Sequence, residues 1–398
     1  MAASSDFPTS LSVPDEVVEI VQRLEVAGYE TWCVGGAVRD ALLGQENKDF
    51  DIATAATPDV VQKLFKRTVP IGIKHGTVAV LDKNREPHEV TTFRRDVKTD
   101  GRHAEVEFGV SLDEDLARRD FTINAIAYHP LKKEWQDPFG GEEDLKKGVI
   151  RAVGDPDHRV KEDYLRILRA LRFAARFGFE IESVTWAAMR ANISGLEYLS
   201  AERVREEWFG GLKTAEKPSQ LVKFWSDVGA LGLWLPEVLE GVGNPDWESV
   251  DNLGGNDPIL NTCLLTTNPA KVFERLRCSR SQIERGRRIG SARNDYPDPK
   301  DAAEVRKWMS KAYEVVDDLV LIAEAYGSGS ELRGAVGQVR ESGAPLRIQD
   351  LAVSGDDLIE MGVPKGPEVG RVLRELLGVV LEEPGLNERS VLVQTIRV

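Results

Sequence analysis

The sequence predicts an α+β protein, with a small mixed β-sheet and helices in the first 150 residues and helices alone from there to the end. Strand-like and helix-like segments alternate as far as residue 150. Beyond it, apolar residues recur at steps of three and four, as at Leu165, Leu168 and Leu171. Stretches rich in Gly, Asn and Pro interrupt this helical pattern without a fixed-period repeat.

The elements of the first domain are expected in a definite order. A helix starts at Pro14 and ends at Gly28, because Pro favours the first helical turn and Gly the end. A strand then runs into Gly35-Gly36. The remaining expected elements are a short helix over 37–44, a strand over 48–54, a helix from Pro58, and strands over 75–82, 88–96 and 103–110.

Composition limits the function classes. The 398 residues are 41% hydrophobic and 30% charged, as in an ordinary soluble globular protein. No apolar run approaches the roughly 18 residues that span a bilayer, and the N-terminus has no secretory signal pattern. Three scattered cysteines suit a reducing compartment. We therefore expect a cytoplasmic protein that makes no membrane contact.

Charge gives a mixed indication about nucleic acid. The net charge of −14 argues against a protein coated with nucleic acid. Two segments oppose this balance, with nine Lys or Arg against four acids over 146–176 and eight against two over 271–293. Each segment can be a solvated helix face or a track for a phosphate backbone, and the sequence leaves both open.

Two aspartates stand close together in the segment NKDFDIAT. Asp49 and Asp51 are separated by one residue, so on a strand both side chains point to the same face. Like charges at this distance repel unless a cation lies between them. A solvated turn is the plain alternative. A third acid, Glu89, lies on another predicted strand, and oxygen ligands of this kind suit Mg²⁺.

The glycine pair upstream is a candidate phosphate-binding turn. Gly35 and Gly36 would let backbone N–H groups approach a ligand closely, and Arg39 follows within one helical turn. A tight turn without a ligand is the alternative. Acids beside such a turn are what magnesium-dependent nucleotidyl transfer requires, because two metal ions can hold the attacking and leaving oxygens.

Three motifs in succession carry a family resemblance. VGGAVRDALLG…DFDIAT, RRDFTINAIAY (118–128) and EDYLRILRALRFAARFGF (162–179) resemble the class II tRNA nucleotidyltransferases, the CCA-adding enzymes, a group that includes bacterial poly(A) polymerases. The segment 351–377 is similar to the tail of these enzymes. The resemblance implies a catalytic nucleotidyltransferase head (1–150), a neck with the base-recognition motif (151–215), a helical body (216–325) and a tRNA-binding tail (326–398).

The resemblance also implies roles for single residues. Asp49 and Asp51 would hold the metal ions, with Glu89 as a weaker catalytic candidate. The nucleotide would be bound by the glycine turn with Arg39 and by the second and third motifs. Those positions are Gly35, Gly36, Arg39, Arg118, Arg119, Asp120, Asn124, Glu162, Asp163 and Arg166. On the following helical turns, Arg169 and Arg172 are further candidates for contact with the triphosphate, with a solvated helix face as the alternative.

A protein template for the base is chemically reasonable at Asp163 and Arg166. We expect both on one helix, three residues apart and therefore on one face. A carboxylate accepts from the amino group of cytosine or adenine, and a guanidinium donates to the adjacent ring nitrogen. One such pair would accept C and A and reject U and G. An ordinary intrahelical salt bridge is the alternative.

The expected partners are the 3′ acceptor end of tRNA, with CTP and ATP as substrates and Mg²⁺ as cofactor. Candidate tRNA contacts are Arg275, Arg277, Arg287 and Arg288, from the second basic run. Segment 93–108, with Gly101 in a turn, resembles the flexible region that complete enzymes use to switch from C to A. We expect a monomer.

Several functions remain open at this point. The chain could add CCA, only CC or only A, or it could be a poly(A) polymerase, although its C-terminus is neither long nor basic. A tRNA-binding protein with an inactive head would have no use for two repelling acids. A metal-dependent phosphohydrolase would need clustered histidines, whereas the five present are scattered.

Overall fold

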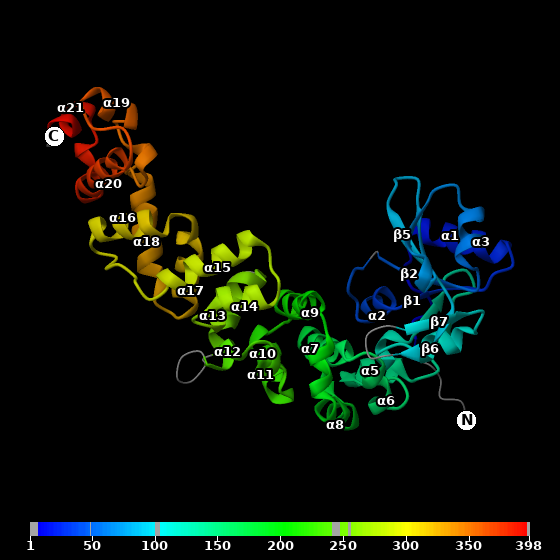
Figure 1. The fold of residues 1–398 in the computed structure, drawn as a ribbon. Coiled ribbons are helices and arrows are strands. Elements are labelled where there is room, and N and C mark those ends of the chain that lie inside the picture. The colour runs from blue at the N-terminus through cyan, green and yellow to red at the C-terminus, as the bar shows by residue number, and fades with distance from the viewer. Residues whose placement is uncertain (1–6, 48, 100–103, 241–246, 254–255, 396–398) are drawn as a thin grey trace. The chain divides into compact units, whose positions relative to one another are not determined.

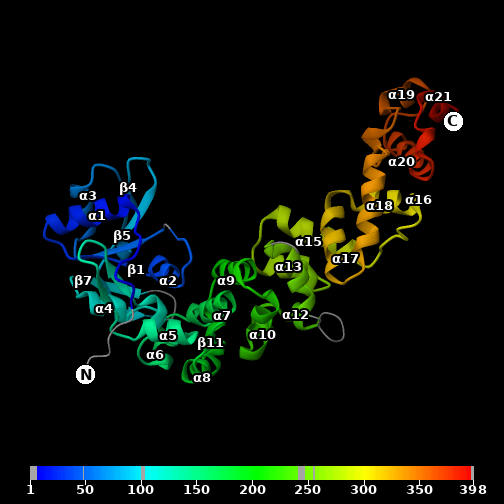
Figure 2. The same cartoon turned by 180° about the vertical axis from the view of Figure 1, so that it is seen from behind.

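The computed structural model describes residues 7–47, 49–99, 104–240, 247–253 and 256–395, with the backbone alone for 96–99 and 104–105. The chain forms two compact units, Met1–Leu233 and Trp234–Val398. Figures 1 and 2 show the sheet in the first unit and helices throughout the second. The predicted α+β class is therefore confirmed, and the finer division into four domains stays a prediction.

The first unit is built on a seven-stranded mixed sheet in the order β3-β4-β5-β2-β1-β8-β9. Strands β2 and β5 run parallel, and every other neighbouring pair is antiparallel. Two small sheets pair β6 with β7 and β10 with β11. The strands are β1 Thr31–Val34, β2 Asp51–Thr54, β3 Thr68–Gly72, β4 Thr77–Leu81, β5 Pro87–Thr92, β6 Arg94–Thr99, β7 Ala104–Phe108, β8 Ala127–His129, β9 Glu134–Gln136, β10 Val149–Ile150 and β11 Glu180–Ile181.

The register of three strands gathers polar residues at one edge of this sheet. Val34, the last residue of β1, lies opposite Asp51, the first residue of β2. The parallel pairing of Ile52 with Val90 then places Asp51 beside Glu89 of β5. Because side chains alternate along a strand, the buried residues Ile52 and Val90 leave Asp51 and Glu89 on the opposite face.

Helices cover the sheet and continue into the neck. The α-helices of this unit are α1 Asp15–Val26, α2 Gly36–Leu42, α3 Pro58–Leu64, α4 Leu112–Ala117, α5 Gly141–Lys147, α6 Pro156–Glu162, α7 Leu165–Phe177, α8 Ser183–Ala191, α9 Ala201–Thr214 and α10 Pro218–Val228, with α11 Ala230–Trp234 at the boundary. The 3₁₀ helices are η1 Ile73–His75, η2 Thr122–Asn124 and η3 Ile193–Tyr198.

The core of the head packs one face of the sheet against α4. Trp32 and Ala53 of the sheet form a buried cluster with Leu112 and Leu116 of α4. A capping box at Ser111 and Glu114 starts α4, because each side chain bonds the other residue's backbone N–H. The position of α4 matters for the site, since the helix delivers Arg118 and Arg119 immediately after its last residue.

Helix α7 separates a buried face from an arginine face. Leu168, Leu171 and Ala175 are buried, as their spacing predicts. The buried side packs against α9 and α10, where Trp208 and Trp225 are fully enclosed and meet edge-to-face with ring centroids 4.9 Å apart. The arginines at three-residue steps are therefore left on the opposite side, toward the head.

Three predicted elements differ from the structure. The strand predicted over 88–96 is divided between β5 and β6, which belong to different sheets. The strand predicted over 48–54 begins only at Asp51, so Asp49 precedes β2. The prediction that Asp163 and Arg166 share one helix is wrong, because α6 ends at Glu162 and Asp163 is extended, with φ −154° and ψ 106°. The segment 93–108 contains the β6–β7 hairpin; its predicted turn at Gly101 lies outside the described residues.

The second unit is all-helical within its described residues. A buried cluster around Leu358, Leu376 and Leu392 joins α19, α20 and α21. No helix in the described part of the chain is long and apolar enough to cross a membrane. The helices are α12 Pro236–Glu240, η4 Trp247–Asn252, α13 Pro258–Leu265, α14 Pro269–Arg275, α15 Arg280–Ala292, α16 Ala302–Ala312, η5 Tyr313–Val315, α17 Val316–Ala325, α18 Gly329–Glu341, η6 Ile348–Asp350, α19 Gly355–Glu360, α20 Pro367–Glu382, η7 Pro384–Leu386 and α21 Arg389–Thr395.

Candidate active site

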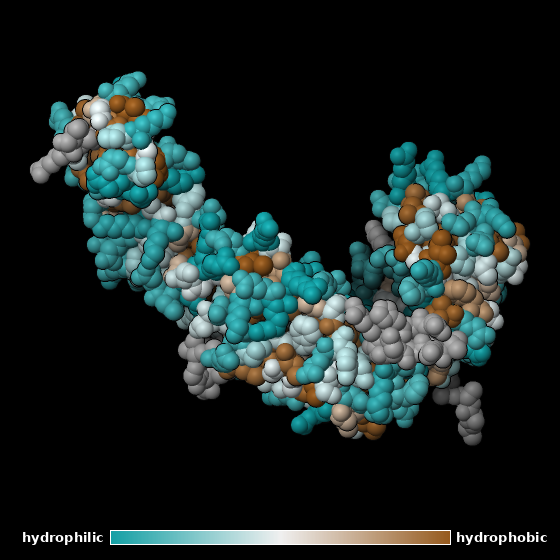
Figure 3. All heavy atoms as spheres, in the orientation of Figure 1, coloured by the Kyte–Doolittle hydropathy of each residue, from teal (hydrophilic) through white to brown (hydrophobic). Residues whose placement is uncertain are grey.

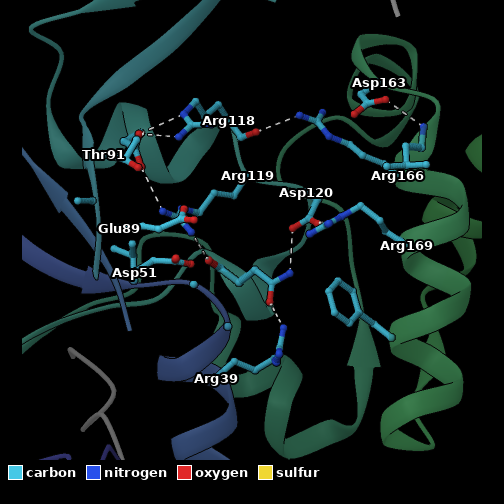
Figure 4. Close-up of a pocket in the computed structure, with 18 of the residues that line it drawn as sticks. Arg39, Asp51, Glu89, Thr91, Arg118, Arg119, Asp120, Asp163, Arg166 and Arg169 are labelled. Carbon is cyan, nitrogen blue, oxygen red and sulfur yellow. Dashed lines mark hydrogen bonds and ion pairs between the residues drawn. The ribbon is translucent and has the colours of Figure 1, made fainter. Parts of the chain in front are cut away.

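An open cavity of about 620 Å³ lies in the first unit, between the sheet edge and the arginine face of α7. Figure 4 shows acids from the strands on one side and arginines from α7 on the other. Most of the predicted site residues line it, although they come from five separate segments. The predicted residues that line it are Gly35, Gly36, Arg39, Asp51, Glu89, Arg118, Arg119, Asp120, Asn124, Asp163, Arg166, Arg169 and Arg172.

Gly35 lines the floor of the cavity, that is, the part of its wall next to Asp51. Its φ of 78° and ψ of −140° belong to a region that glycine adopts far more readily than other residues. A Cβ atom there would lie 2.9 Å from Asp51 Oδ2 and 3.2 Å from Arg119 Nη1. Glycine therefore serves two purposes at this position: it permits the turn and it leaves room for the two charged groups.

Asp51 is the most perturbed acid of the cavity. Asp51 is an exposed residue, but neighbouring protein atoms weaken the solvation of its carboxylate and raise its pKa to about 6, with Arg119 opposing the rise and Glu89 and Asp49 adding to it. Asp49 is exposed on the same side of the chain, since Phe50 between them is buried. Asp51 is thus close enough to both Glu89 and Asp49 to be repelled by them, although of these two only Glu89 lines the cavity.

These acids fit an open magnesium site. Among the residues that the structure describes, no group of three or more His, Cys, Asp or Glu is arranged to enclose a metal ion. Mg²⁺ does not need such a cage, because it keeps several waters and is bound through one or two carboxylates plus substrate phosphates. Loss of solvation is the main cause of the raised pKa of Asp51, and a divalent cation would offset both this loss and the added repulsion from Glu89 and Asp49.

Asp115 orients the arginines that follow α4. Its buried carboxylate accepts from Arg118 Nη2 at 3.0 Å through Oδ1 and pairs with Arg119 Nη2 at 3.4 Å through Oδ2. Burial alone would raise the pKa of Asp115, but the two guanidiniums outweigh it and lower the value. Asp115 was missing from the sequence prediction, although its spacing of three and four residues from the arginines could have indicated it.

A chain of buried polar contacts links the head to α7. Arg169 Nε donates to Asp120 Oδ2 at 2.7 Å, and Asn124 Nδ2 donates to Asp120 Oδ1 at 2.9 Å. Arg39 Nη1 donates to the amide oxygen of Asn124 at 2.6 Å. Burial alone would raise the pKa of Asp120, yet Arg169 and these hydrogen bonds hold it at about 2.

Arg39 is buried, and its guanidinium donates hydrogen bonds to protein groups. It donates to Asp40 Oδ1 from Nε at 2.9 Å and from Nη2 at 2.6 Å. Its guanidinium carbon lies 4.9 Å from the ring centroids of both Phe173 and Phe177. The predicted contact of Arg39 with a phosphate stays a prediction, and the partners seen here give it a role in joining α2 to α7.

The candidate base-reading residues sit at the break between α6 and α7. Asp163 pairs with Arg203 of α9 at 2.7 Å, and Arg166 pairs with Glu162 at 2.5 Å. Asp163 and Arg166 both line the cavity, but not through the shared helix face that we expected. Arg172 pairs with Glu207 of α9 at 2.5 Å. Arg203 and Glu207 are sequence-distant partners that no local spacing could have indicated.

The candidate tRNA-binding arginines all lie in the second unit. Arg275 makes two bonds to Glu237, at 2.5 and 2.6 Å. Arg287 pairs with Glu274 at 3.1 Å and with Glu284 at 2.6 Å, and Arg288 pairs with Glu284 and Glu314. Arg277, with φ 50°, follows α14. Figure 3 shows mainly hydrophilic residues on the visible face of this unit, and nearby acids offset much of the basic run's charge.

Sequence comparisons cover almost the whole chain. The chain is 36% identical over 397 residues to a protein named CCA-adding enzyme from Leuconostoc mesenteroides, spanning 96% of each. It is 36% identical over 395 residues to the protein of that name from Levilactobacillus brevis, spanning 95% of this chain and 96% of the relative. The chain belongs to the CCA-adding enzyme family. The predicted family is therefore confirmed.

Further matches agree with this family. Residues 31–151 match the family described as the poly A polymerase head domain, and residues 178–238 match the probable RNA and SrmB-binding site of polymerase A. The crystal structure of the Bacillus stearothermophilus CCA-adding enzyme in complex with CTP superposes with a TM-score of 0.79 at 30% identity, over 96% of both chains. The Thermotoga maritima CCA-adding enzyme complexed with tRNA shares the fold, with a TM-score of 0.68 at 23% identity and 96% coverage of both chains.

The ion pair of Asp120 and Arg169 should contribute to the free energy of unfolding. Asp120→Asn should lower the free energy of unfolding of the first unit by roughly 2 kcal/mol at pH 7, because it leaves Arg169, whose side chain is 35% exposed, without its carboxylate. Since the folded pKa of Asp120, about 2, is below its unfolded value of 3.8, the wild-type advantage is complete above pH 4. It should then disappear as the pH falls from 4 toward 2.

Urea unfolding followed by tryptophan fluorescence at several pH values measures this difference. The matched control is Asp227→Asn on α10, an exposed residue whose i,i+4 pair with Lys223 is solvated, and whose loss should change stability by less than about 0.5 kcal/mol. Equal stabilities of wild type and Asp120→Asn at pH 7 would contradict the stabilising role.

Proposed function

We propose that this chain adds C, C and A to the 3′ end of tRNA, using CTP and ATP in a magnesium-dependent nucleotidyl transfer. The observation that carries the proposal is the cavity, in which strand-edge acids face nine arginines within a chain that matches CCA-adding enzymes over nearly its full length. In this reaction the 3′ hydroxyl oxygen of the tRNA bonds to the α-phosphorus and the bond to pyrophosphate breaks.

Each side of the cavity has a separate task in this proposal. Asp49 and Asp51 would hold magnesium, which when bound would offset the negative charge of the triphosphate and favour attack by the hydroxyl. Arg118 and Arg119, already held by Asp115, would bind the sugar and phosphates. Donors fixed before the substrate arrives require little reorganisation during the reaction.

The residues at the α6–α7 break would read the base. The carboxylate of Asp163 would accept from the amino group of cytosine or adenine, and Arg166 would donate to the ring nitrogen. Both line the cavity on the side of the neck. A single template suits both nucleotides, so the order of addition would come from the growing RNA end and from the segment 93–108.

The rest of the molecule would bind the body of the tRNA. Arg275, Arg277, Arg287 and Arg288 stay predicted contacts, and their paired acids suggest that any phosphate must compete with Glu237, Glu274, Glu284 and Glu314. Glu89 stays a weaker catalytic candidate. A monomer in the cytoplasm remains the expected state.

Stepwise addition tests the proposed function directly. Purified protein is given tRNA lacking its CCA end, with CTP, with ATP, or with both. Two additions with CTP alone, and a third when ATP is also present, are expected. Arrest at CC with both nucleotides would instead identify a CC-adding enzyme, and action only on tRNA already ending in CC would identify an A-adding one. Long A tails on unrelated RNA would indicate a poly(A) polymerase. A protein that binds tRNA but adds no nucleotide would have an inactive head.

Gly35→Ala tests whether the crowded floor of the cavity matters for transfer. The added Cβ should displace Asp51 and Arg119 and lower kcat/KM for CTP by at least about ten-fold. Gly44→Ala is the matched control, because Gly44 also has a positive φ, 72°, but open space around its Cβ position. Its transfer rate should stay within about two-fold of wild type, since strain at positive φ mainly affects stability. Equal activity of both variants would contradict this account of the floor.

Arg166→Ala tests the base template. If Arg166 donates to the base, its removal should reduce the preference for CTP over UTP by about ten-fold or more, because a good side-chain pair with a base contributes roughly 1–3 kcal/mol of discrimination. Steady-state kcat/KM with each of the four nucleotides gives the ratios. A proportional loss for all four nucleotides would show that Arg166 forms only a structural salt bridge.

A further inference from the structure

Arg159 lies behind the base-reading residues and outside the cavity lining. It is on α6, its side chain is 13% exposed, and its guanidinium bonds two backbone carbonyls and one carboxylate. Nε donates to the carbonyl of Val153 at 3.1 Å, and Nη2 donates to the carbonyl of Ala117 at 2.7 Å. Nη1 donates to Glu162 Oε2 at 2.7 Å. Arg159 therefore connects α6 to the end of α4.

Arg166 repeats this arrangement one residue further along the head. Its Nη1 donates to the same Glu162 Oε2 at 2.5 Å and to the carbonyl of Arg159 at 2.7 Å. Its Nη2 donates to the carbonyl of Arg118 at 3.1 Å. Two guanidiniums thus share one carboxylate and bond the consecutive carbonyls of Ala117 and Arg118.

These contacts position Arg166 relative to α6, since the two do not belong to one continuous helix. Because α6 ends at Glu162 and α7 begins at Leu165, Arg166 is not held in line with α6 by helical hydrogen bonding. The two carbonyls that accept these bonds belong to Arg118, the first residue of the Arg118–Arg119 pair, and to Ala117, the residue before it. The position of Arg166 relative to the arginines expected to bind the triphosphate is therefore set by its own bond to the Arg118 carbonyl and by the carboxylate that it shares with Arg159.

We propose that Arg159 is a positioning residue for base selection, which holds Glu162 and Arg166 at a fixed place relative to Arg118 and Arg119. The proposal rests on the proposed function, in which Arg166 reads the base. Without Arg159, the carboxylate of Glu162 still pairs with Arg166. It loses its link, through the Arg159 guanidinium, to the carbonyls of Ala117 and Val153. Arg166 would then depend mainly on its own bond to the Arg118 carbonyl for its place relative to the head, and a shift of about 1 Å at a positioned group can lower a rate about 100-fold.

The test compares base selection in matched variants. Steady-state kcat/KM for CTP, ATP, UTP and GTP is measured on one tRNA substrate for wild type, Arg159→Ala, Arg159→Lys and Lys161→Ala. Lys161 is the control because it lies on the same helix but is exposed and pairs with Asp157. Arg159→Ala should lower the CTP-to-UTP ratio at least about five-fold, Arg159→Lys should restore part of it, and Lys161→Ala should match wild type within about two-fold.

A double variant separates positioning from simple structural support. If Arg159 acts through Arg166, then Arg159→Ala combined with Arg166→Ala should have the same CTP-to-UTP ratio as Arg166→Ala alone, within about two-fold. Unchanged ratios in Arg159→Ala, with all four kcat/KM values reduced together, would overturn the proposal. So would a further multiplicative loss in the double variant. Should Arg159→Ala fail to fold, the ratio in Arg159→Lys decides in the same way.

The activity of the wild-type protein in this experiment separates failure of this inference from failure of the proposed function. Wild-type protein that adds neither C nor A to tRNA would contradict the proposed function itself and this inference with it. Wild-type protein that adds both, together with a normal ratio in the Arg159 variants, would overturn the role of Arg159 alone.

Discussion

The ion pair between buried Asp120 and half-buried Arg169 is the interaction on which the rest of the site depends. Asp120 follows the two arginines at the end of α4, and Arg169 lies in the middle of α7. Their ion pair, continued through Asn124 to Arg39, is a buried link between the sheet domain and the neck helix. Asp120 is buried, so its charge left without a partner would be strongly unfavourable, whereas Arg169 keeps some contact with solvent. The cavity has its shape because this link holds its two sides together.

The arginines of the cavity share a second property: carboxylates hold most of them in place. Asp115 holds Arg118 and Arg119, Asp120 holds Arg169, and Glu207 holds Arg172. A long flexible side chain loses rotamer freedom when it binds a ligand, and here part of that ordering occurs when the protein folds. The lining still contains nine arginines against five acids, so the cavity favours an anionic ligand overall.

Local sequence patterns predicted the parts of the site well but not how they meet. Asp51 and the glycine turn were predictable because strand alternation and glycine geometry act over a few residues, whereas Asp49 precedes β2 and lies outside the cavity lining. The arginine face of α7 followed from helical periodicity. The break at Asp163 was not predictable in this way, because the pattern of apolar residues continues across it. The extended backbone there is accompanied by tertiary contacts, among them the pair of Asp163 with Arg203 forty residues later.

The partners of the predicted residues were the main omission. Asp115, Glu207 and Arg203 have no motif of their own that marks them, and two of the three are distant in sequence from the groups that they hold. The same limit applies to the basic run in the second unit. Its arginines suggested a phosphate track, yet the acids that pair with them come partly from other helices, such as Glu237 and Glu314. Charge counted along the chain therefore overstates the charge that this surface offers.

A double-mutant cycle on Asp120 and Arg169 tests the central claim most directly. Hydrogen exchange, followed by mass spectrometry on peptides covering 118–125 and 165–177, gives the opening free energies of the two segments in wild type, Asp120→Asn, Arg169→Gln and the double variant. We predict a coupling energy of at least about 1 kcal/mol in both peptides, because each charge depends on the other. Effects that add to within about 0.3 kcal/mol would show that the pair does not join the head to the neck, and would contradict this account.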